Sequence, residues 1–371
     1  MDSSPQRITR LTPLAAVLTL IESRVEAVRP QKVKVSVEAA RHFTLAEDIW
    51  AKWPRDSTAL ADGYAVSAAS VADAGPYMPV PLLQPARRVD EGDVMPDGTD
   101  AVLPLDAVVM RGDRAEAVAS VAPGEGMWAA GDNPFPGQPF YGAGEQLHAI
   151  DVYVLQGVGV SEVSIRAPRI RVVLGGKAGS PSLQVAQSML VRVIGEAGGV
   201  VDGGFSAFDE GALNGEPADA LIVVGGTGSG RHDDAVNTLA RLGRVEIHGV
   251  AISPGSTAAF GFSGSRPVLL VPGRLDAALA VWLLIGRHLV AKLTGQTITD
   301  RPTTMPLKGK ITSTIGITEL VAVACDGALL EPVASGHLSL KSLAYSNGWI
   351  VIPAESEGFP AFTQVAVRPW P

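Results

Sequence analysis

The sequence is poor in cysteine, charged residues and aromatic residues. Its 371 residues include one cysteine, Cys325, which excludes a disulfide within the chain and indicates a reducing compartment. Charged residues make up 18% of the chain and aromatic residues 5%. So low a charge content favours an oligomer that buries part of the surface of each copy. The formal net charge of −8 disfavours nucleic acids and anionic membranes as partners, although a local basic pocket can still bind an anionic small molecule.

Several common functional motifs are also missing. The histidines show no HxH or HExxH spacing, which disfavours a zinc site. There is no G-x-S-x-G segment, which disfavours a lipase-type serine hydrolase. No apolar run reaches the length that a membrane span needs. The periodic segment at about residues 12–28 predicts an amphipathic helix rather than a signal peptide, so we expect a cytoplasmic protein.

Glycine, proline and aliphatic residues are abundant instead. The chain contains 41 Gly and 27 Pro and is 46% hydrophobic, which predicts many short elements joined by turns. A chain of 371 residues is also too long for one compact core. We therefore expect between two and four domains.

The most informative local pattern lies between Asp219 and Asp234. An apolar run at residues 220–224 is typical of a strand that is buried on both faces, and a helical pattern starts at about residue 236. Backbone N–H groups at such a strand–loop–helix junction can bind an anion, and glycine allows a phosphate to approach closely. The loop matches neither a P-loop nor a dinucleotide fingerprint, so a βα turn without a ligand is the alternative. The residues of this loop are Gly225, Gly226, Thr227, Gly228, Ser229 and Gly230.

Asp62 and Gly63 form a turn signal between two apolar flanks. A carboxylate at the tip of a turn can point into a cleft, although most Asp-Gly pairs only make the turn. The segment DGYAV at residues 62–66, preceded by LAEDIWAKWPRDSTALA, resembles the signature segment of the MoeA family, which includes the E domain of gephyrin. In that family, the Asp that matches Asp62 is a catalytic residue of molybdenum insertion into molybdopterin.

The resemblance extends over most of the chain. Its further segments are GDVMPDGTDAV at 92–102, PRIRVVL at 168–174, the Gly225 loop, AISPGSTAAFG at 251–261, PVLLVPGRL at 267–275 and SGHLSLKSLAYSNGWIVIPAES at 335–356. It implies a multidomain α/β plus β fold: a three-layer α/β molybdopterin-binding domain, an inserted β-rich domain and a C-terminal β-barrel-like domain. The implied boundaries are 1–50 with 141–168 for an elongated N-terminal domain, 51–140 for the inserted domain, 169–297 for the α/β domain and 298–371 for the β domain.

The resemblance also implies a homodimer. In the family, the inserted domain of one chain approaches the α/β site of the other, so Asp62 would lie near the Gly225 loop only across the dimer interface. The apolar cluster at residues 275–293 is most simply a buried packing helix, and dimerisation is its leading functional interpretation. A recipient molybdoenzyme or another protein of the cofactor pathway is a further expected partner.

Three loops form the implied ligand site. The ligand would be molybdopterin or adenylylated molybdopterin, with Mg²⁺ and molybdate as further candidates. Asp233 and Asp234 could contact such a ligand or a metal, but residues at a helix start more often cap the helix. The ligand-binding residues would be the six of the Gly225 loop with Asp233, then Pro254 and Gly255, and finally Pro272, Gly273 and Arg274.

The chain departs from the family pattern at positions that carry the chemistry. After Leu174, the family has Ser-Thr-Gly-Asp-Glu-Leu with a functional Glu, whereas this chain has GGKAGSPSL without a carboxylate. The family's Lys-Pro-Gly-Lys-Pro has become SPGST at residues 253–257, and its Pro-Gly-Asn-Pro has become PGRL at 272–275. Lys177, Arg231 and Arg274 are new cations that could offset the lost lysines.

Two functions follow from this comparison of motifs. The first is a MoeA-like protein that binds molybdopterin or its adenylylated form but has reduced or lost molybdate insertion, acting as a carrier, chaperone or scaffold. The second is an active molybdopterin molybdotransferase, with Asp62 as the catalytic acid. The missing Glu and lysines favour the first function, whereas Asp62 and Asp233 favour the second. Kinship at the level of the fold does not choose between them.

Overall fold

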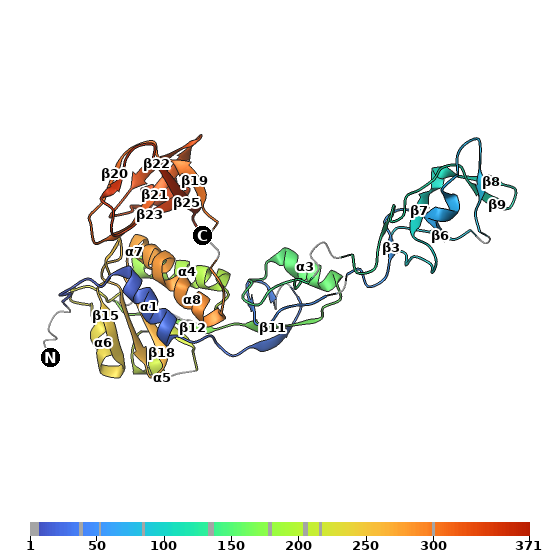
Figure 1. The fold of residues 1–371 in the computed structure, drawn as a ribbon. Helices are drawn as coiled ribbons and strands as arrows, with labels where there is room; N and C mark the ends of the chain where they lie inside the picture. The colour runs from blue at the N-terminus through green and yellow to red at the C-terminus, as the bar shows by residue number, and fades with distance from the viewer. Residues whose placement is uncertain are drawn as a thin grey trace. The chain divides into compact units, whose positions relative to one another are not determined.

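The computed structural model describes residues 7–36, 40–51, 53–83, 86–132, 137–176, 180–202, 207–214, 217–298 and 301–371. The chain divides into two compact units (Figure 1). The first comprises Met1–Glu47, Ala143–Val152 and Glu162–Pro371, and the second comprises Asp48–Gly142 and Tyr153–Ser161. The finer division into four domains stays a prediction.

A six-stranded sheet forms the centre of the first unit. Its order is β13-β12-β14-β18-β17-β15. The first four strands of this order are parallel, and the last two are antiparallel to their neighbours. The bounds are β12 Arg169–Leu174, β13 Val200–Asp202, β14 Ala220–Val224, β15 Arg244–His248, β17 Ala259–Ser263 and β18 Arg266–Val271. Every residue of β14 is buried, as its uniformly apolar sequence predicts.

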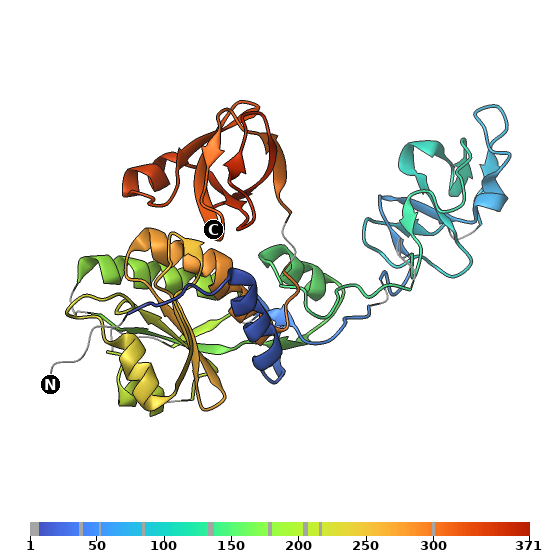
Figure 2. The ribbon, with the colours of Figure 1, turned by 60° about the vertical axis from the view of Figure 1, so that its left-hand side comes forward.

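Helices cover both faces of this sheet and make the predicted three layers (Figures 1 and 2). Side chains of β12 alternate between the two faces: Val172 joins the core under the first set of helices, and Val173 joins the core under the second set. The first set is α1 Leu14–Arg24, α4 Pro181–Glu196, α7 Leu275–Val281, the π-helical turn η3 Trp282–Gly286 and α8 Arg287–Thr294, and the second is α5 Glu210–Asn214 and α6 Ala235–Leu242.

The helix Leu275–Thr294 corrects one expectation. Its 20 residues, with a mean hydropathy of 1.4 over the most apolar window, are long and apolar enough to cross a membrane by length and composition. The expectation that no segment reaches this length was therefore wrong. It considered continuous apolar runs, and Arg287 and His288 interrupt the run without ending the helix. Within the fold, 83% of that window is buried, as is typical of a core helix.

The C-terminal β part of the first unit is built on a second sheet with the order β16-β21-β23-β25-β19, and β22 also pairs with β21. A single isolated bridge, Leu307 to Leu330, links the segment after β19 to β22. The arrangement is thus barrel-like, but no continuous ladder of the described strands closes it. The bounds are β16 Ile252–Ser253, β19 Thr303–Pro306, β20 Ile311–Thr312, β21 Thr318–Asp326, β22 Leu329–Ala334, α9 Leu340–Tyr345, β23 Gly348–Ile352, β24 Gly358–Phe359 and β25 Gln364–Pro369.

A short sheet completes the first unit, with the order β1-β11-β2 for Gln31–Lys34, Glu162–Arg166 and Thr44–Leu45. The predicted helix at about 12–28 is observed as α1, which starts after Pro13 and ends where Val25 becomes extended. Helix α3, Ala149–Gly157, contributes residues to both units.

The second unit is rich in β structure. Its sheets have the orders β6-β4-β7, β5-β9-β8 and β10-β3. A small core of aliphatic side chains, including Val71, Leu82 and Leu103, holds it together. The bounds are β3 Thr58–Ala59, β4 Gly63–Val66, η1 Ala68–Val71, β5 Val80–Pro81, β6 Arg88–Val89, β7 Ala101–Pro104, η2 Leu105–Ala107, β8 Val108–Arg111, β9 Arg114–Ala117 and β10 Met127–Trp128.

Candidate functional site

The start of the glycine loop requires glycine. The backbone φ angle is +86° at Gly225 and +73° at Gly226, a region that residues with a side chain rarely adopt. A Cβ atom at Gly226 would also collide with the carbonyl oxygen of Gly175, in the loop that follows β12. These two glycines are therefore explained by the packing of neighbouring loops at the edge of the sheet.

The loops after β14 and β18 lie side by side. Gly225 donates its backbone N–H to the carbonyl oxygen of Val271, at the end of β18, over 2.7 Å. A Cβ atom at Gly273 would meet the side chain of Leu183 from α4 and would lie 3.4 Å from the Cα of Gly225. The structure thus brings together the Gly225 loop and the segment Pro272, Gly273 and Arg274, as expected at the carboxyl edge of a parallel sheet.

Asp233 closes the exposed end of the glycine loop. Its Oδ2 accepts the backbone N–H of Gly230 over 2.8 Å. A Cβ atom at Gly228 would lie only 2.8 Å from the same oxygen. The side chain of Asp234, at the start of α6, instead accepts hydrogen bonds from the side chains of Asn237 and Thr238. The structure gives Asp233 a role within the loop, and its contact with a ligand stays a prediction.

Thr227 connects the glycine loop to the loop that contains Pro254 and Gly255. Thr227 is buried, and its hydroxyl lies 2.9 Å from the hydroxyl of Thr257. Its carbonyl oxygen lies 3.1 Å from Nε2 of His248. The sequence did not indicate Thr257 or His248 as site residues. The three predicted loops therefore form one neighbourhood, held by contacts between residues far apart in the chain.

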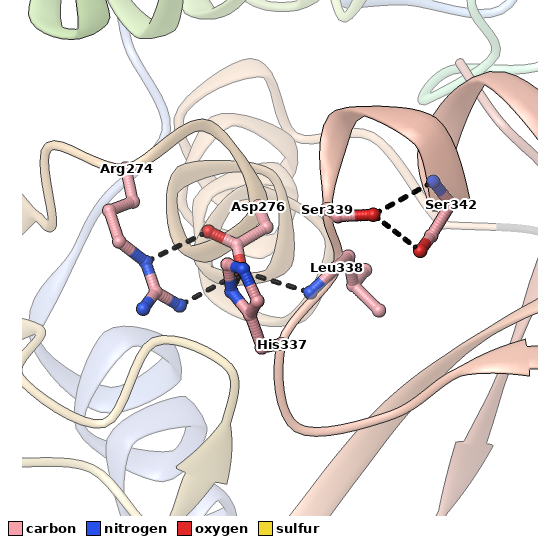
Figure 3. A network of polar contacts seen from close by, with 6 residues as sticks. All are labelled: Arg274, Asp276, His337, Leu338, Ser339 and Ser342. Atoms are coloured by element: carbon pink, nitrogen blue, oxygen red, sulfur yellow. Dashed lines mark hydrogen bonds and ion pairs between the residues drawn. The ribbon is translucent and has the colours of Figure 1, made fainter.

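Arg274 forms a bidentate pair with Asp276 (Figure 3). Its Nε and one terminal nitrogen donate to the two carboxylate oxygens of Asp276 over 3.1 and 2.9 Å. The guanidinium side chain is 60% exposed, whereas the side chain of Asp276 is 3% exposed. The cation that could replace the lost lysines is therefore already paired with a buried carboxylate.

The same carboxylate binds the segment that precedes α9 (Figure 3). Leu338 donates its backbone N–H to Oδ2 of Asp276 over 3.1 Å, and Nδ1 of His337 lies 2.9 Å from that oxygen. Burial by itself raises the pKa of Asp276, but the hydrogen bonds from Leu338, Arg274 and Ala277 together hold that pKa below its ordinary value. Asp276 is thus a carboxylate at neutral pH. It joins the α/β part to the C-terminal β part.

A cavity of about 450 Å³ lies beside these contacts. The lining residues used below are Ser253, Pro254, Gly255, Ser256, Arg274 and Glu319. Glu319 reaches the cavity because β16 pairs in parallel with β21, with Ser253 opposite Glu319. Glu319 is only 8% exposed, and its carboxylate has no hydrogen-bond or ion-pair partner among the described residues.

The charges around this cavity do not favour a multiply charged anion. Arg274 contributes one positive charge, which Asp276 offsets, and Glu319 adds a negative charge. Serine occupies positions 253 and 256, where the resemblance implies lysines. Arg231, the other described cation near the glycine loop, is exposed, and Lys177 lies outside the described residues. The residues that the sequence did not single out, Asp276 and Glu319, are both acidic.

Asp62 belongs to the second unit. It is exposed at the turn before β4, and its Oδ1 accepts the backbone N–H of Glu91 over 2.9 Å. Gly63 is buried in β4, and a Cβ atom there would meet Val102 and the carbonyl oxygen of Leu103 on β7. The Asp-Gly pair therefore has a structural reason for its glycine, while its carboxylate stays accessible. Within the described ranges, no group of three or more His, Cys, Asp or Glu residues could hold a metal ion.

Comparisons with known proteins agree on one family. Residues 12–159 match the family model for the MoeA N-terminal region, domains I and II. A putative molybdopterin biosynthesis protein of Methanocaldococcus jannaschii is 25% identical over 393 residues, which cover 95% of this chain and 96% of the relative. Molybdopterin molybdenumtransferase 1 of Mycobacterium tuberculosis is 27% identical over 402 residues, which cover 89% of this chain and 93% of the relative.

Solved structures agree on the fold. The molybdopterin biosynthesis MoeA protein from Pyrococcus horikoshii OT3 superposes with a TM-score of 0.75, at 22% identity, over 97% of this chain and 100% of that one. A second structure of a molybdopterin biosynthesis MoeA protein from Pyrococcus horikoshii gives a TM-score of 0.74 at 24% identity. At this level of identity the likeness concerns the fold, and it confirms the multidomain α/β plus β architecture.

Proposed function

Because the chain belongs to the MoeA family and is a MoeA-like protein of molybdenum cofactor biosynthesis, we propose that it binds molybdopterin or adenylylated molybdopterin and inserts molybdate poorly or not at all. The phosphate end of the ligand would lie at the Gly225 loop, with Gly228 and Gly230 leaving room for it and Asp233 moving away from the loop. The segment Pro272, Gly273 and Arg274 would flank it.

The charge balance of the 450 Å³ cavity supports the second half of this proposal. Molybdate must be held beside a ligand that is itself anionic. Each missing charge contact in such a site costs about 1–3 kcal/mol, and each 1.4 kcal/mol is about a tenfold change in rate. The loss of two lysines, together with the buried Glu319, then corresponds to a loss of about 10²–10⁴ in insertion activity.

The alternative is an active molybdopterin molybdotransferase. Its support is the accessible carboxylate of Asp62, together with the near full-length similarity to proteins named molybdopterin molybdenumtransferase. We place it second because Asp62 acts in the family together with cationic residues that this chain lacks.

Binding and insertion can be tested separately. Calorimetry with purified molybdopterin is expected to show binding by the unmodified chain and none by Gly228→Val, because the valine side chain would fill the space beside Asp233. Gly309→Val is the control, since a Cβ atom there meets nothing within 4 Å. Equal affinity for the unmodified chain and Gly228→Val would show that the loop is only a turn.

The insertion activity is measured by rescue of a strain that lacks its own insertase. We expect little or no rescue by the unmodified chain. Strong rescue at physiological molybdate would favour the active enzyme, and Asp62→Ala in the same assay would then show whether the retained acid carries the reaction.

We also propose that the protein acts as a cytoplasmic homodimer. The support is the charge content of 18% and a set of exposed large hydrophobic side chains in the second unit. Among these, Trp50 is 63% exposed and Trp128 is 48% exposed. Tryptophan is enriched in protein–protein interfaces relative to the rest of the protein surface.

A further inference from the structure

A cavity of about 960 Å³ lies at the edge of the six-stranded sheet where its parallel strands begin. Its lining comes from the end of α1 and the segment after it, and from the starts of β12, β13 and β18. The Gly225 loop follows the other end of β14, roughly 20 Å from Asp219 at about 3.3 Å per residue. The cavity is therefore apart from the molybdopterin site proposed above. Four arginines line it, namely Arg24, Arg29, Arg169 and Arg266.

Two of these arginines lie on a segment whose course is fixed. Helix α1 ends at Arg24, and the chain then becomes extended. Val28 donates its backbone N–H to the carbonyl oxygen of Leu293 in α8 over 2.8 Å. Arg29 comes next and precedes a proline, which favours an extended backbone at that position. The segment thus carries Arg24 and Arg29 along one side of the cavity.

The backbone of Arg169, at the start of β12, is held by the start of the neighbouring strand. Its N–H donates to Oδ2 of Asp219 over 2.7 Å, and its carbonyl oxygen accepts the N–H of Asp219 over 2.7 Å. The side chain of Arg169 makes no hydrogen bond or ion pair with another described residue, and the same holds for Arg29. Both residues are exposed. Their guanidinium groups are therefore available to a ligand.

Arg266 adds a positive charge at the first residue of β18. One of its terminal nitrogens donates to the carbonyl oxygen of Leu213, and its buried Nε has no hydrogen-bond partner in the described part of the chain. Burial, followed by the charge of Arg171, lowers the pKa of Arg266. A partly buried guanidinium beside a second one is unfavourable, and an anion in the cavity would offset this repulsion.

The charge of the cavity is opposite to that of the chain. The guanidinium carbon of Arg24 is 5.2 Å from the ring centroid of Phe262, a cation–π contact that orients the group and keeps its charge. The described lining holds four arginines and two carboxylates, those of Glu26 and Asp219, which leaves an excess of two positive charges. The whole chain has a formal net charge of −8. A positive cavity in an acidic protein selects an anionic ligand.

Part of the lining is apolar. Val200, at the start of β13, is 39% exposed, and Val28 is half-buried. Both line the cavity, together with Ala167 and Ala218. Such a surface binds the apolar part of a ligand, because its contact with the ligand removes apolar area from water.

We propose that this cavity binds an organic phosphate, a small molecule that combines a phosphate group with an apolar body. A phosphate ester carries nearly two negative charges at neutral pH, which matches the excess charge of the lining. Its oxygens would accept hydrogen bonds from the forked guanidinium groups of Arg29 and Arg169, and its apolar part would lie on Val28 and Val200. The volume of about 960 Å³ falls within the range of about 300–1,000 Å³ that is usual for small-molecule sites.

Titration of the full chain with phenyl phosphate, followed by phosphorus NMR, tests the proposal. Saturable binding is expected, with a Kd below about 1 mM. Arg29→Gln and Arg169→Gln are each expected to raise this Kd at least fivefold, and both residues are exposed, so their replacement leaves the core intact. Arg114→Gln is the matched control, since it removes the same charge from an exposed residue of β9 that does not line the cavity. Circular dichroism and the Tm of each variant show whether it folds.

Two further measurements separate the parts of the ligand and the two sites. Val200→Ser is expected to weaken binding of phenyl phosphate about threefold and to leave the affinity for inorganic phosphate unchanged. Gly228→Val, which blocks the glycine loop, is expected to leave the Kd for phenyl phosphate unchanged, so this proposal and the proposed function fail independently.

Three results would overturn the inference. The first is the absence of saturable binding up to about 10 mM phenyl phosphate, well above the Kd of about 1 mM of a weak site. The second is an equal Kd for the unmodified chain and for both Arg29→Gln and Arg169→Gln. The third is an equal loss of affinity in Arg114→Gln and Arg169→Gln, which would show that the net charge of the chain, rather than this cavity, attracts the phosphate.

Discussion

The guanidinium group of Arg274 and the carboxylate of Asp276 form a bidentate pair, with hydrogen bonds of 3.1 and 2.9 Å. Asp276 is 3% exposed and holds Leu338 of the C-terminal β part with the same carboxylate. A bidentate arginine–carboxylate pair has a defined geometry and is stronger than a hydrogen bond between neutral groups. Arg274 is therefore a fixed and largely neutralised cation at the edge of the candidate site. The pairing of Arg274 with Asp276 is the main structural reason to expect weak binding of anions at the candidate site.

Replacing the buried partner of this pair is expected to destabilise the protein. Asp276→Asn removes the charge that binds Arg274 and His337 and leaves the hydrogen bond from Leu338 poorly matched. We expect a loss of about 1–3 kcal/mol in the free energy of unfolding. The loss stays in this range because Arg274, the charged partner of Asp276, is itself largely exposed to solvent. Denaturant unfolding or calorimetry measures this loss. Asp326→Asn, which breaks the exposed pair with Lys308, is the control and is expected to leave the Tm unchanged.

The contribution of Asp276 to stability is also expected to depend on pH. Its folded-state pKa lies below the ordinary value, because the hydrogen bonds from Leu338, Arg274 and Ala277 outweigh the effect of burial. The contribution is then fully present above the unfolded-state pKa of about 3.9 and is lost as the pH falls through the lower folded-state pKa. The Tm difference between the unmodified chain and Asp276→Asn should be constant near neutral pH and shrink below about pH 4. A difference that persists unchanged in acid would contradict this assignment.

Restoring positive charge to the cavity is expected to restore part of the insertion activity. The double variant Ser253→Lys with Ser256→Lys adds two cations to its lining, and Glu319→Gln removes the unpaired carboxylate. We expect the two lysines to raise rescue of an insertase-deficient strain about 10–100-fold, and Glu319→Gln to raise it further.

The control for this experiment adds the same charge elsewhere. Ser263→Lys with Ser265→Lys places two lysines at the turn between β17 and β18, outside the cavity beside Arg274. This variant is expected to rescue no better than the unmodified chain. Equal gains from both double variants would show that total charge, rather than charge in the cavity, limits the activity.

The protein is expected to be a homodimer in solution. Light scattering coupled to size-exclusion chromatography should give twice the mass of 38.5 kDa at micromolar concentration. Replacing Trp50 and Trp128, which are exposed in the second unit, by serine tests whether that surface forms the interface. A monomer for the unmodified chain would remove the model in which Asp62 reaches the glycine loop across two chains.

Much of the fold could be predicted from local sequence patterns. The apolar run at 220–224 is a fully buried strand, and the two glycines that follow it directly, Gly225 and Gly226, have the positive φ angles that only glycine adopts readily. The resemblance to the MoeA family, carried by segments such as DGYAV, indicated the architecture that the solved relatives share. These features are predictable because strand burial and turn geometry are determined by residues close together in the chain.

The charge state of the candidate site was decided only by the tertiary structure. His337 and Leu338 reach Asp276 from about 60 residues away, as the separations of 61 and 62 residues show. Glu319 lines the cavity because β16 pairs in parallel with β21, and no local sequence pattern predicts this pairing. The helix Leu275–Thr294 is a similar case, because its composition suits both a membrane and a protein core and only its packing distinguishes them. The sequence determined which segments could form strands, loops and helices, whereas long-range packing determined which charges meet, since electrostatic energy depends on distances in space rather than along the chain.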